Sequence, residues 1–250
     1  EVAVDPEMLG KVYESLIAEE EKGEAGIFYT HRMEIDLMCR LSLINYLHTK
    51  TNINKEELIN IVFKPYLIFN YQNLENLKSI RHHLDKVKIV DPAVGSASFL
   101  VGMMNILVEL QSLLIRQIEG RDENIFALKQ KIIRENLYGV DVKEWAVMVG
   151  ELRLWLSLII ETDEKYMDIY TKPLLPNLSF KIRQGDSLVE DIRGVFINLR
   201  GDSIKYIPIQ TQNKIKQLMD RKAEFFSGQR SADLKEVKDI ESFEKDIFEG

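Results

Sequence analysis

The sequence predicts an α/β fold in which helices cover both faces of a doubly wound sheet. Three short segments, 87–91, 136–141 and 180–188, each carry an aspartate at or near their end and are typical of strands. Longer segments with apolar residues at helical spacing separate them. Strands that alternate with helices favour a parallel sheet, whose strands end together at the edge where ligands bind.

The first predicted strand, residues 87–91, is followed by a turn of small residues. Its β-branched side chains favour a buried strand, and Pro92 ends it because proline cannot donate a hydrogen bond to a neighbouring strand. Gly95 allows a sharp turn or the close approach of a ligand. Ala97 and Leu100 stand where a nicotinamide-binding turn has its second and third glycines, so dinucleotide binding is disfavoured.

The helix after this turn is predicted to begin near Ser96 or Ser98, because either serine can cap it. We expect Ala97 to lie in the first helical turn with a negative φ. Apolar residues then recur at helical spacing, at Phe99, Leu100, Met103, Met104 and Leu107.

Further helices are predicted between and after the strands. Residues 107–133 predict two helices broken near Gly120, and residues 143–160 predict a third. The charged segment 209–248 predicts two more helices around a break at 227–229. We expect three parts: a helical lead-in at 1–85, a sheet-containing core at 86–200 and a helical extension at 201–250.

Residues 91–100, Asp-Pro-Ala-Val-Gly-Ser-Ala-Ser-Phe-Leu, resemble motif I of the N6-adenine DNA methyltransferases, usually Asp-Pro-Ala-Cys-Gly-Ser-Gly-x-Phe-Leu. The resemblance implies a Rossmann-like sheet whose turn holds the methionine part of S-adenosylmethionine. Val94 replaces the usual cysteine, and Ala97 replaces the second glycine. If Ala97 were forced to a positive φ, a glycine there would stabilise the chain and tighten the cofactor.

Three more segments resemble motifs of this family. Residues 139–156 resemble motif II, whose acid accepts hydrogen bonds from the ribose, although the leucines and tryptophan of this segment are typical of plain core. Residues 185–188 resemble motif III, whose acid accepts a hydrogen bond from the adenine amine, but Gly-Asp-Ser alone is also typical of a turn. Residues 26–31 resemble motif X, which closes over the methionine end, with His31 where proline is usual. The resemblance implies a cofactor site at Phe28, Tyr29, Thr30, Asp91, Ala93, Gly95, Ser96, Phe99, Asp141, Val142, Asp186 and Ser187.

The order of these motifs, X before I, II and III, resembles the gamma group, in the branch of type IIG and type IIS restriction enzymes that carry nuclease and methyltransferase on one chain. It implies methyl transfer from S-adenosylmethionine to adenine N6 in double-stranded DNA. The catalytic motif IV of the family, Asn-Pro-Pro-Tyr or a variant, needs adjacent prolines, whereas the six prolines here are all isolated. We therefore expect a fragment that ends before its catalytic loop and holds no catalytic residue. The alternative is a catalytically silent module that binds cofactor and positions DNA for a nuclease.

Composition is typical of part of an intracellular enzyme. The net charge of −7 disfavours an autonomous DNA-binding domain, so most DNA contact is expected from other parts of the parent protein. Cys39 is the only cysteine, which excludes a disulfide within the chain and favours the cytoplasm. The first residues lack the pattern of a signal peptide, and no apolar run reaches about 18 residues, so a membrane is not expected as a partner.

Two weaker patterns have plainer interpretations. The histidines at 48, 82 and 83 lack zinc-ligand spacing, so no metal is expected. Asp233 with Glu236 and Lys238 resembles a restriction-nuclease signature, but its charged helical surroundings favour a solvated helix face.

Overall fold

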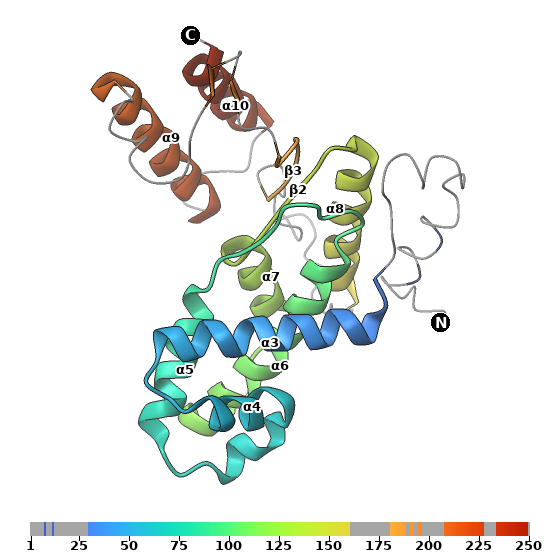
Figure 1. Cartoon of the computed structure of the whole chain (residues 1–250), viewed down its shortest axis with the longest axis vertical. Helices are drawn as coiled ribbons and strands as arrows, with labels where there is room; N and C mark the ends of the chain where they lie inside the picture. The colour runs from blue at the N-terminus through green and yellow to red at the C-terminus, as the bar shows by residue number, and fades with distance from the viewer. Residues whose placement is uncertain are drawn as a thin grey trace. The chain divides into compact units, whose positions relative to one another are not determined.

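The computed structural model describes residues 30–160, 181–188, 191–192, 195–196, 208–227 and 234–249, together with Met8 and Val12 (Figure 1). The chain divides into two compact units, Glu1–Gly185 and Asp186–Gly250. Two predicted site residues, Phe28 and Tyr29, lie outside the described residues. The domain boundaries near residues 85 and 200 stay predictions.

Within residues 30–88, four helical segments precede the sheet: α3 (Arg32–Lys50), α4 (Lys55–Phe63), the 3-10 helix η1 (Pro65–Asn70) and α5 (Leu74–Lys86) (Figure 1). Asparagine side chains determine where two of them begin. Asn54 Oδ1 accepts the N–H of Glu56 at the start of α4, and Asn73 Oδ1 accepts the N–H of Asn76 at the start of α5.

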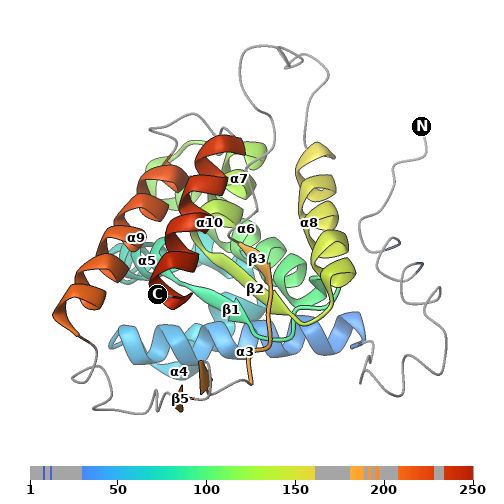
Figure 2. The same cartoon turned by 90° about the horizontal axis from the view of Figure 1, so that it is seen from above.

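Three parallel strands follow in the order β1-β2-β3: β1 (Ile89–Asp91), β2 (Leu137–Asp141) and β3 (Ile182–Gln184) (Figure 2). Asp91 lies opposite Gly139, and Asp141 lies opposite Gln184. The predicted α/β organisation with parallel strands is therefore confirmed, while the doubly wound arrangement stays a prediction.

Two details of the strands differ from expectation. The third strand is shorter than predicted, so Gly185 and Asp186 follow β3 rather than belong to it. The prediction that the first strand is buried is wrong at Val90, whose side chain is 62% exposed. Val90 lines an open groove between β1 and α3, so no core side chain covers it there.

Among the described residues between the strands, three form helices: α6 (Ser98–Glu119), α7 (Ile125–Glu135) and α8 (Glu144–Ile159). The predicted break near Gly120 is confirmed, because this glycine ends α6 in the left-handed conformation with φ +67°. Asn124 then caps α7 by accepting the N–H of Ala127. The predicted helix at 143–160 is also confirmed, as α8.

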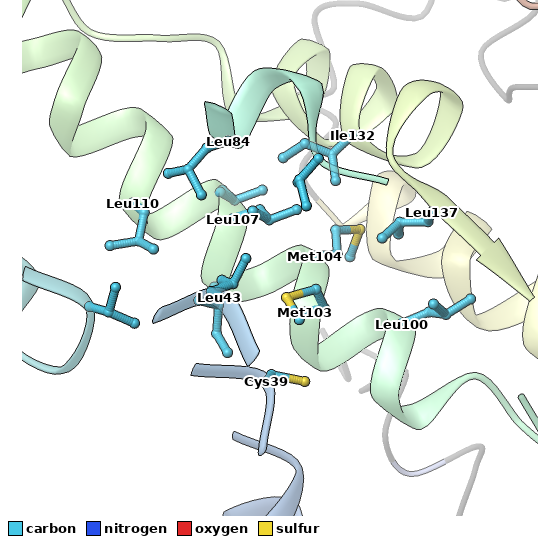
Figure 3. Close-up of a cluster of buried hydrophobic side chains, with 14 of the residues drawn as sticks. Cys39, Leu43, Leu84, Leu100, Met103, Met104, Leu107, Leu110, Ile132 and Leu137 are labelled. Carbon is cyan, nitrogen blue, oxygen red and sulfur yellow. The ribbon is translucent and has the colours of Figure 1, made fainter. Parts of the chain in front are cut away.

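α6 is the central helix of the core (Figure 3). Residues from α3, α5, α7 and β2 surround its buried side chains, among them Leu43, Leu84, Ile132 and Leu137. By length and composition α6 could also cross a membrane, but 61% of its apolar window is buried inside the protein. Its apolar length is thus explained by the core.

The second unit contains a short antiparallel pair, β4 (Asp191–Ile192) with β5 (Val195–Phe196), and two helices, α9 (Ile209–Ser227) and α10 (Leu234–Glu249). α9 and α10 pack through buried Leu218, Phe225, Val237 and Ile240. Lys222 Nζ lies 2.7 Å from Glu244 Oε1. The two predicted helices are confirmed, and Glu236 and Lys238 lie on one of them.

Candidate cofactor-binding site

The turn after β1 is held against β2 by backbone contacts. The N–H of Val94 donates to the carbonyl of Val140 (2.9 Å), and the N–H of Ala97 donates to the carbonyl of Val94 (2.8 Å). The buried Val94 side chain packs directly on Gly139, where a Cβ would lie only 2.8 Å from Val94 Cγ2. Glycine at 139 therefore lets the turn approach the strand.

Asp141, the last residue of β2, joins this turn to the start of α8. Its Oδ2 accepts the N–H of Gly95 (2.8 Å), and its Oδ1 accepts the N–H of Lys143 (2.9 Å). Each carboxylate oxygen can accept a further hydrogen bond, because an ionised carboxylate offers about four acceptor positions. The side chain is half-buried, so this capacity is open to a ligand.

Gly95 presents an open surface beside Asp141. Its φ of +50° is one that L side chains rarely adopt, and a Cβ built on it would meet nothing within 4 Å. The predicted site residues Gly95 and Asp141 are thus brought together, and no atom of the described residues fills the position where a side chain at 95 would begin.

Ala97 has φ +63° and ψ +29°, the left-handed conformation. The prediction of a negative φ in the first helical turn is wrong, because α6 begins at Ser98 and Ala97 precedes it as the N-cap residue. Its methyl group is fully buried. Alanine is therefore strained at this position, where the family resemblance has glycine.

The predicted serine cap of α6 is also wrong. Ala97 caps the helix with no side-chain hydrogen bond. The hydroxyls of Ser96 and Ser98 lie 3.4 Å apart and face the guanidinium of Arg153 instead.

Arg153, on α8, is the functional residue that the sequence analysis missed. It is 3% exposed. Its Nη1 donates toward the carbonyl of Ser96 (2.6 Å), the Ser96 hydroxyl (2.8 Å) and the Ser98 hydroxyl (2.8 Å). A single arginine within the apolar run 152–156 was the available signal, since a buried charge needs hydrogen-bonding partners.

Gly150 brings α8 close to the same turn. A Cβ there would lie 3.2 Å from Ala97 Cβ, 3.2 Å from Ile182 Cδ1 and 3.5 Å from the carbonyl oxygen of Gly95. α8 therefore packs against the turn at two points about one helical turn apart, Gly150 and Arg153.

Asp91 lies on the β1 side of the turn. Its Oδ1 accepts the N–H of Ala93 (3.1 Å), while its buried Oδ2 has no hydrogen-bond partner among the described residues. Burial raises the pKa of the Asp91 carboxyl above its ordinary value, the Ala93 N–H opposes that shift, and the charge of Asp141 adds to it.

The other predicted site residues have different surroundings. Phe99 is half-buried against the core, and its carbonyl accepts a weak hydrogen bond from Cys39 Sγ (3.8 Å). Val142 is 56% exposed, and its carbonyl accepts a hydrogen bond from Gln184 Nε2 (3.0 Å). Thr30 is half-buried just before α3.

Asp186 and Ser187 belong to the second unit. Both are exposed, and Asp186 Oδ1 accepts the N–H of Leu188 (2.9 Å). This contact is the turn that Gly-Asp-Ser favours on its own.

A groove of about 460 Å³ runs between α3 and β1, lined mainly by apolar side chains that include Met38, Tyr46, Val90, Phe99 and Met103. Asp91 and Pro92 also line it, whereas Gly95 and Asp141 do not.

Comparison with known proteins gives a family for this arrangement. Residues 69–217, more than half of the chain, match the family described as MmeI, DNA-methyltransferase domain. The chain belongs to this family. The part matched to the MmeI methyltransferase domain contains the turn after β1, Asp141 and Asp186, and it does not include residues 26–31.

This methyltransferase-family chain is similar to parts of two longer proteins. It is 34% identical over 220 residues, 83% of its length, to a Methanocaldococcus jannaschii protein named as a type II restriction enzyme and methyltransferase. It is 23% identical over 176 residues, 69% of its length, to DNA methyltransferase A of Bacillus subtilis. The chain spans 18% of the length of each relative. No solved structure matches it. The predicted membership of a DNA methyltransferase family is therefore confirmed.

Proposed function

We propose that the site at Gly95 and Asp141 binds S-adenosylmethionine, and that the chain is the cofactor-binding part of a DNA methyltransferase that transfers the methyl group to adenine N6 in double-stranded DNA within a restriction-modification enzyme. One observation carries the proposal. The carboxylate at the end of β2 accepts the N–H of the glycine in the turn after β1. An acid and an open glycine turn at the same sheet edge are what a nucleoside cofactor requires.

Donors and acceptors at this edge suit the cofactor. The free acceptor positions of Asp141 suit the two ribose hydroxyls. Open space at Gly95 suits the amino acid end, which would approach the backbone closely. We assign the adenine amine to Asp186, and the methionine end to Phe28, Tyr29 and Thr30, by the family resemblance.

The protein's part in the chemistry is to orient and to exclude water. When bound, S-adenosylmethionine supplies the reactive sulfonium. The target amine must be flipped out of the duplex and its protons accepted at fixed positions. Because the 250 residues contain no adjacent prolines, they do not supply the Asn-Pro-Pro-Tyr groups that the resemblance assigns to that step. DNA would be the macromolecular partner, and the cytoplasm the compartment where it is met.

Calorimetric titration with S-adenosylhomocysteine, the demethylated product, tests the cofactor site. Asp141→Ala leaves the N–H groups of Gly95 and Lys143 without this acceptor and removes the ribose contact. A loss of about 1–3 kcal/mol is expected, which is roughly five- to 150-fold in affinity. Asp186→Ala is expected to weaken binding to a similar degree.

Asp85→Ala is the matched control, because Asp85 precedes β1 at the opposite end of the strand. Its carboxylate pairs with Lys131 Nζ (2.9 Å) in a partly exposed ion pair, which contributes little. Affinity should be unchanged in this variant. Unchanged affinity in both Asp141→Ala and Asp186→Ala would reject the assignment, and absence of binding by the wild-type protein would reject the proposed function.

A further inference from the structure

We infer that Arg153 is a positioning residue that holds the turn after β1 in its cofactor-binding shape. Its Nη1 lies within 2.6–2.8 Å of three oxygens, which belong to Ser96 and Ser98. These residues flank Ala97, the strained residue of the turn. The inference rests on the proposed cofactor site and adds a residue that touches neither the cofactor nor its acids.

The burial of Arg153 requires an explanation. A guanidinium that is 3% exposed has lost most of its hydration, and an apolar side chain of similar size would avoid that cost. The three oxygens that its Nη1 contacts among the described residues lie in the turn, 55 or 57 residues earlier in the chain. Arginine rather than leucine at this point of an apolar helix is therefore explained by the turn that it holds.

The contacts act on the conformation of Ala97. Alanine disfavours a left-handed backbone, so the turn would relax if nothing restrained the residues on both sides. Arg153 clamps the carbonyl and hydroxyl before Ala97 and the hydroxyl after it. Gly150, three residues earlier on α8, supports the methyl group of Ala97 from the same side.

Relaxation of the turn would reach the cofactor site directly. Gly95 lies two residues before Ala97, and its N–H is the donor to Asp141 Oδ2. When Ala97 leaves the left-handed conformation, the Gly95 amide turns away from Asp141. The acid then loses the contact that aligns it, and cofactor affinity falls although no cofactor contact has been removed.

The test compares Arg153→Met with Lys129→Met by titration with S-adenosylhomocysteine. Lys129 is also a buried cation anchored on α8, since its Nζ donates to the carbonyl of Ser157 (3.2 Å), but it does not touch the turn. Both variants should lose thermal stability. Arg153→Met should bind about tenfold or more weakly, because it loses charge-assisted hydrogen bonds, whereas Lys129→Met should bind as the wild type does. Arg153→Lys keeps the charge but has a shorter side chain, so it should be intermediate.

Rescue by glycine separates positioning from general destabilisation. In the Arg153→Met background, Ala97→Gly should restore affinity to within about threefold of wild type, since glycine adopts the left-handed conformation without strain. The same substitution should not change affinity in the Lys129→Met background, because Arg153 there already holds the turn, so the tighter binding expected for glycine at a positive φ should be absent. If Arg153→Met does not fold, the pair Ser96→Ala and Ser98→Ala removes two of the acceptors from the turn and should show a smaller loss with the same rescue.

The outcomes are distinct. Wild-type affinity in Arg153→Met, or a loss that Ala97→Gly does not reverse, would overturn the positioning role and leave the cofactor site in place. Absence of binding by the wild-type protein would overturn the cofactor site, and the positioning role with it.

Discussion

The methyl group of Ala97 has opposing effects on the stability of the turn. A left-handed backbone costs an L-residue about 1–2 kcal/mol relative to glycine. Burial of the methyl group stabilises the folded state by about 0.8 kcal/mol. Alanine also lowers the conformational entropy of the unfolded chain, which adds about 0.4–1 kcal/mol of stability. Strain and packing therefore nearly balance at this position.

A positive φ alone would make glycine stabilising at position 97, as expected from the sequence, but the buried methyl group of alanine offsets that gain. We therefore predict that Ala97→Gly changes the free energy of unfolding by less than about 1 kcal/mol, because these three contributions cancel. Ala146→Gly is the matched control. Ala146 is 2% exposed on α8 and has no left-handed strain to release, so its replacement should cost about 1–2 kcal/mol. Urea denaturation of both variants measures the difference, and equal losses would show that Ala97 is unstrained.

The raised pKa of the Asp91 carboxyl leads us to predict that the stability of the fold depends on pH. Burial raises the pKa of its carboxyl in the folded protein, so the folded state binds the proton more tightly than the unfolded state. The carboxylate therefore destabilises the fold at neutral pH. This penalty disappears only below about 3.9, the ordinary aspartate pKa, where both states are protonated.

Asp91→Asn should accordingly have a higher melting temperature than the wild type at pH 7 and the same melting temperature as the wild type at about pH 3. The amide oxygen of asparagine can still accept the N–H of Ala93. Thermal unfolding across this pH range measures the effect, with Asp186→Asn as a control at an exposed turn. A melting temperature at pH 7 equal to or below that of wild type would contradict the prediction.

At the scale of elements, glycine determines how closely α3 approaches α6. A Cβ at Gly102 on α6 would lie 2.7 Å from Cγ2 of Ile35 on α3, closer than real atoms pack. Ile35 is itself 6% exposed, so its side chain is buried and cannot readily move away to make room for an added methyl group.

We predict that Gly102→Ala destabilises the protein by about 1–3 kcal/mol through overpacking. In the Ile35→Ala background the clash is gone, and the same change should become stabilising by up to about 1 kcal/mol, because alanine favours a helix over glycine. Gly185→Ala is a control with ordinary contact distances. Chemical denaturation of the four variants of this cycle measures the coupling, and additive effects would rule out the clash.

The elements were predictable from the sequence because each depends on local spacing. Apolar periodicity and the break at Gly120 indicate α6 and α7, and the aspartates mark the ends of the first two strands. The contact of Gly95 with Asp141 follows from parallel pairing of those strands. The conformation of Ala97 was not predictable, since it depends on Arg153, more than fifty residues away. Exposure of Val90 also depends on a distant element, because α3 leaves the groove beside β1 open.

At the scale of the whole chain, charge and motif content separate cofactor binding from catalysis. The net charge is −7, whereas DNA is bound mainly through cationic side chains that displace its counterions. The residues that form the proposed cofactor site, Gly95 and Asp141, need no basic surface. We therefore expect the 250-residue chain to bind a cofactor without binding DNA in the position that methyl transfer needs.

The last prediction is that these 250 residues alone do not methylate DNA. Methyl transfer requires the flipped adenine, the acceptors for its amine protons and a stacking ring to be held within about 0.5 Å of a productive geometry. The isolated prolines exclude an Asn-Pro-Pro-Tyr sequence from this chain. Incubation with tritiated S-adenosylmethionine and a mixed-sequence duplex should give no label above background, while an adenine methyltransferase added to the same mixture should label the duplex. Calorimetry on the same preparation establishes whether cofactor is bound. Labelled N6-methyladenine from the chain alone would mean that its catalytic groups lie among residues assigned no such role, and the separation of cofactor site from catalytic loop would have to be abandoned.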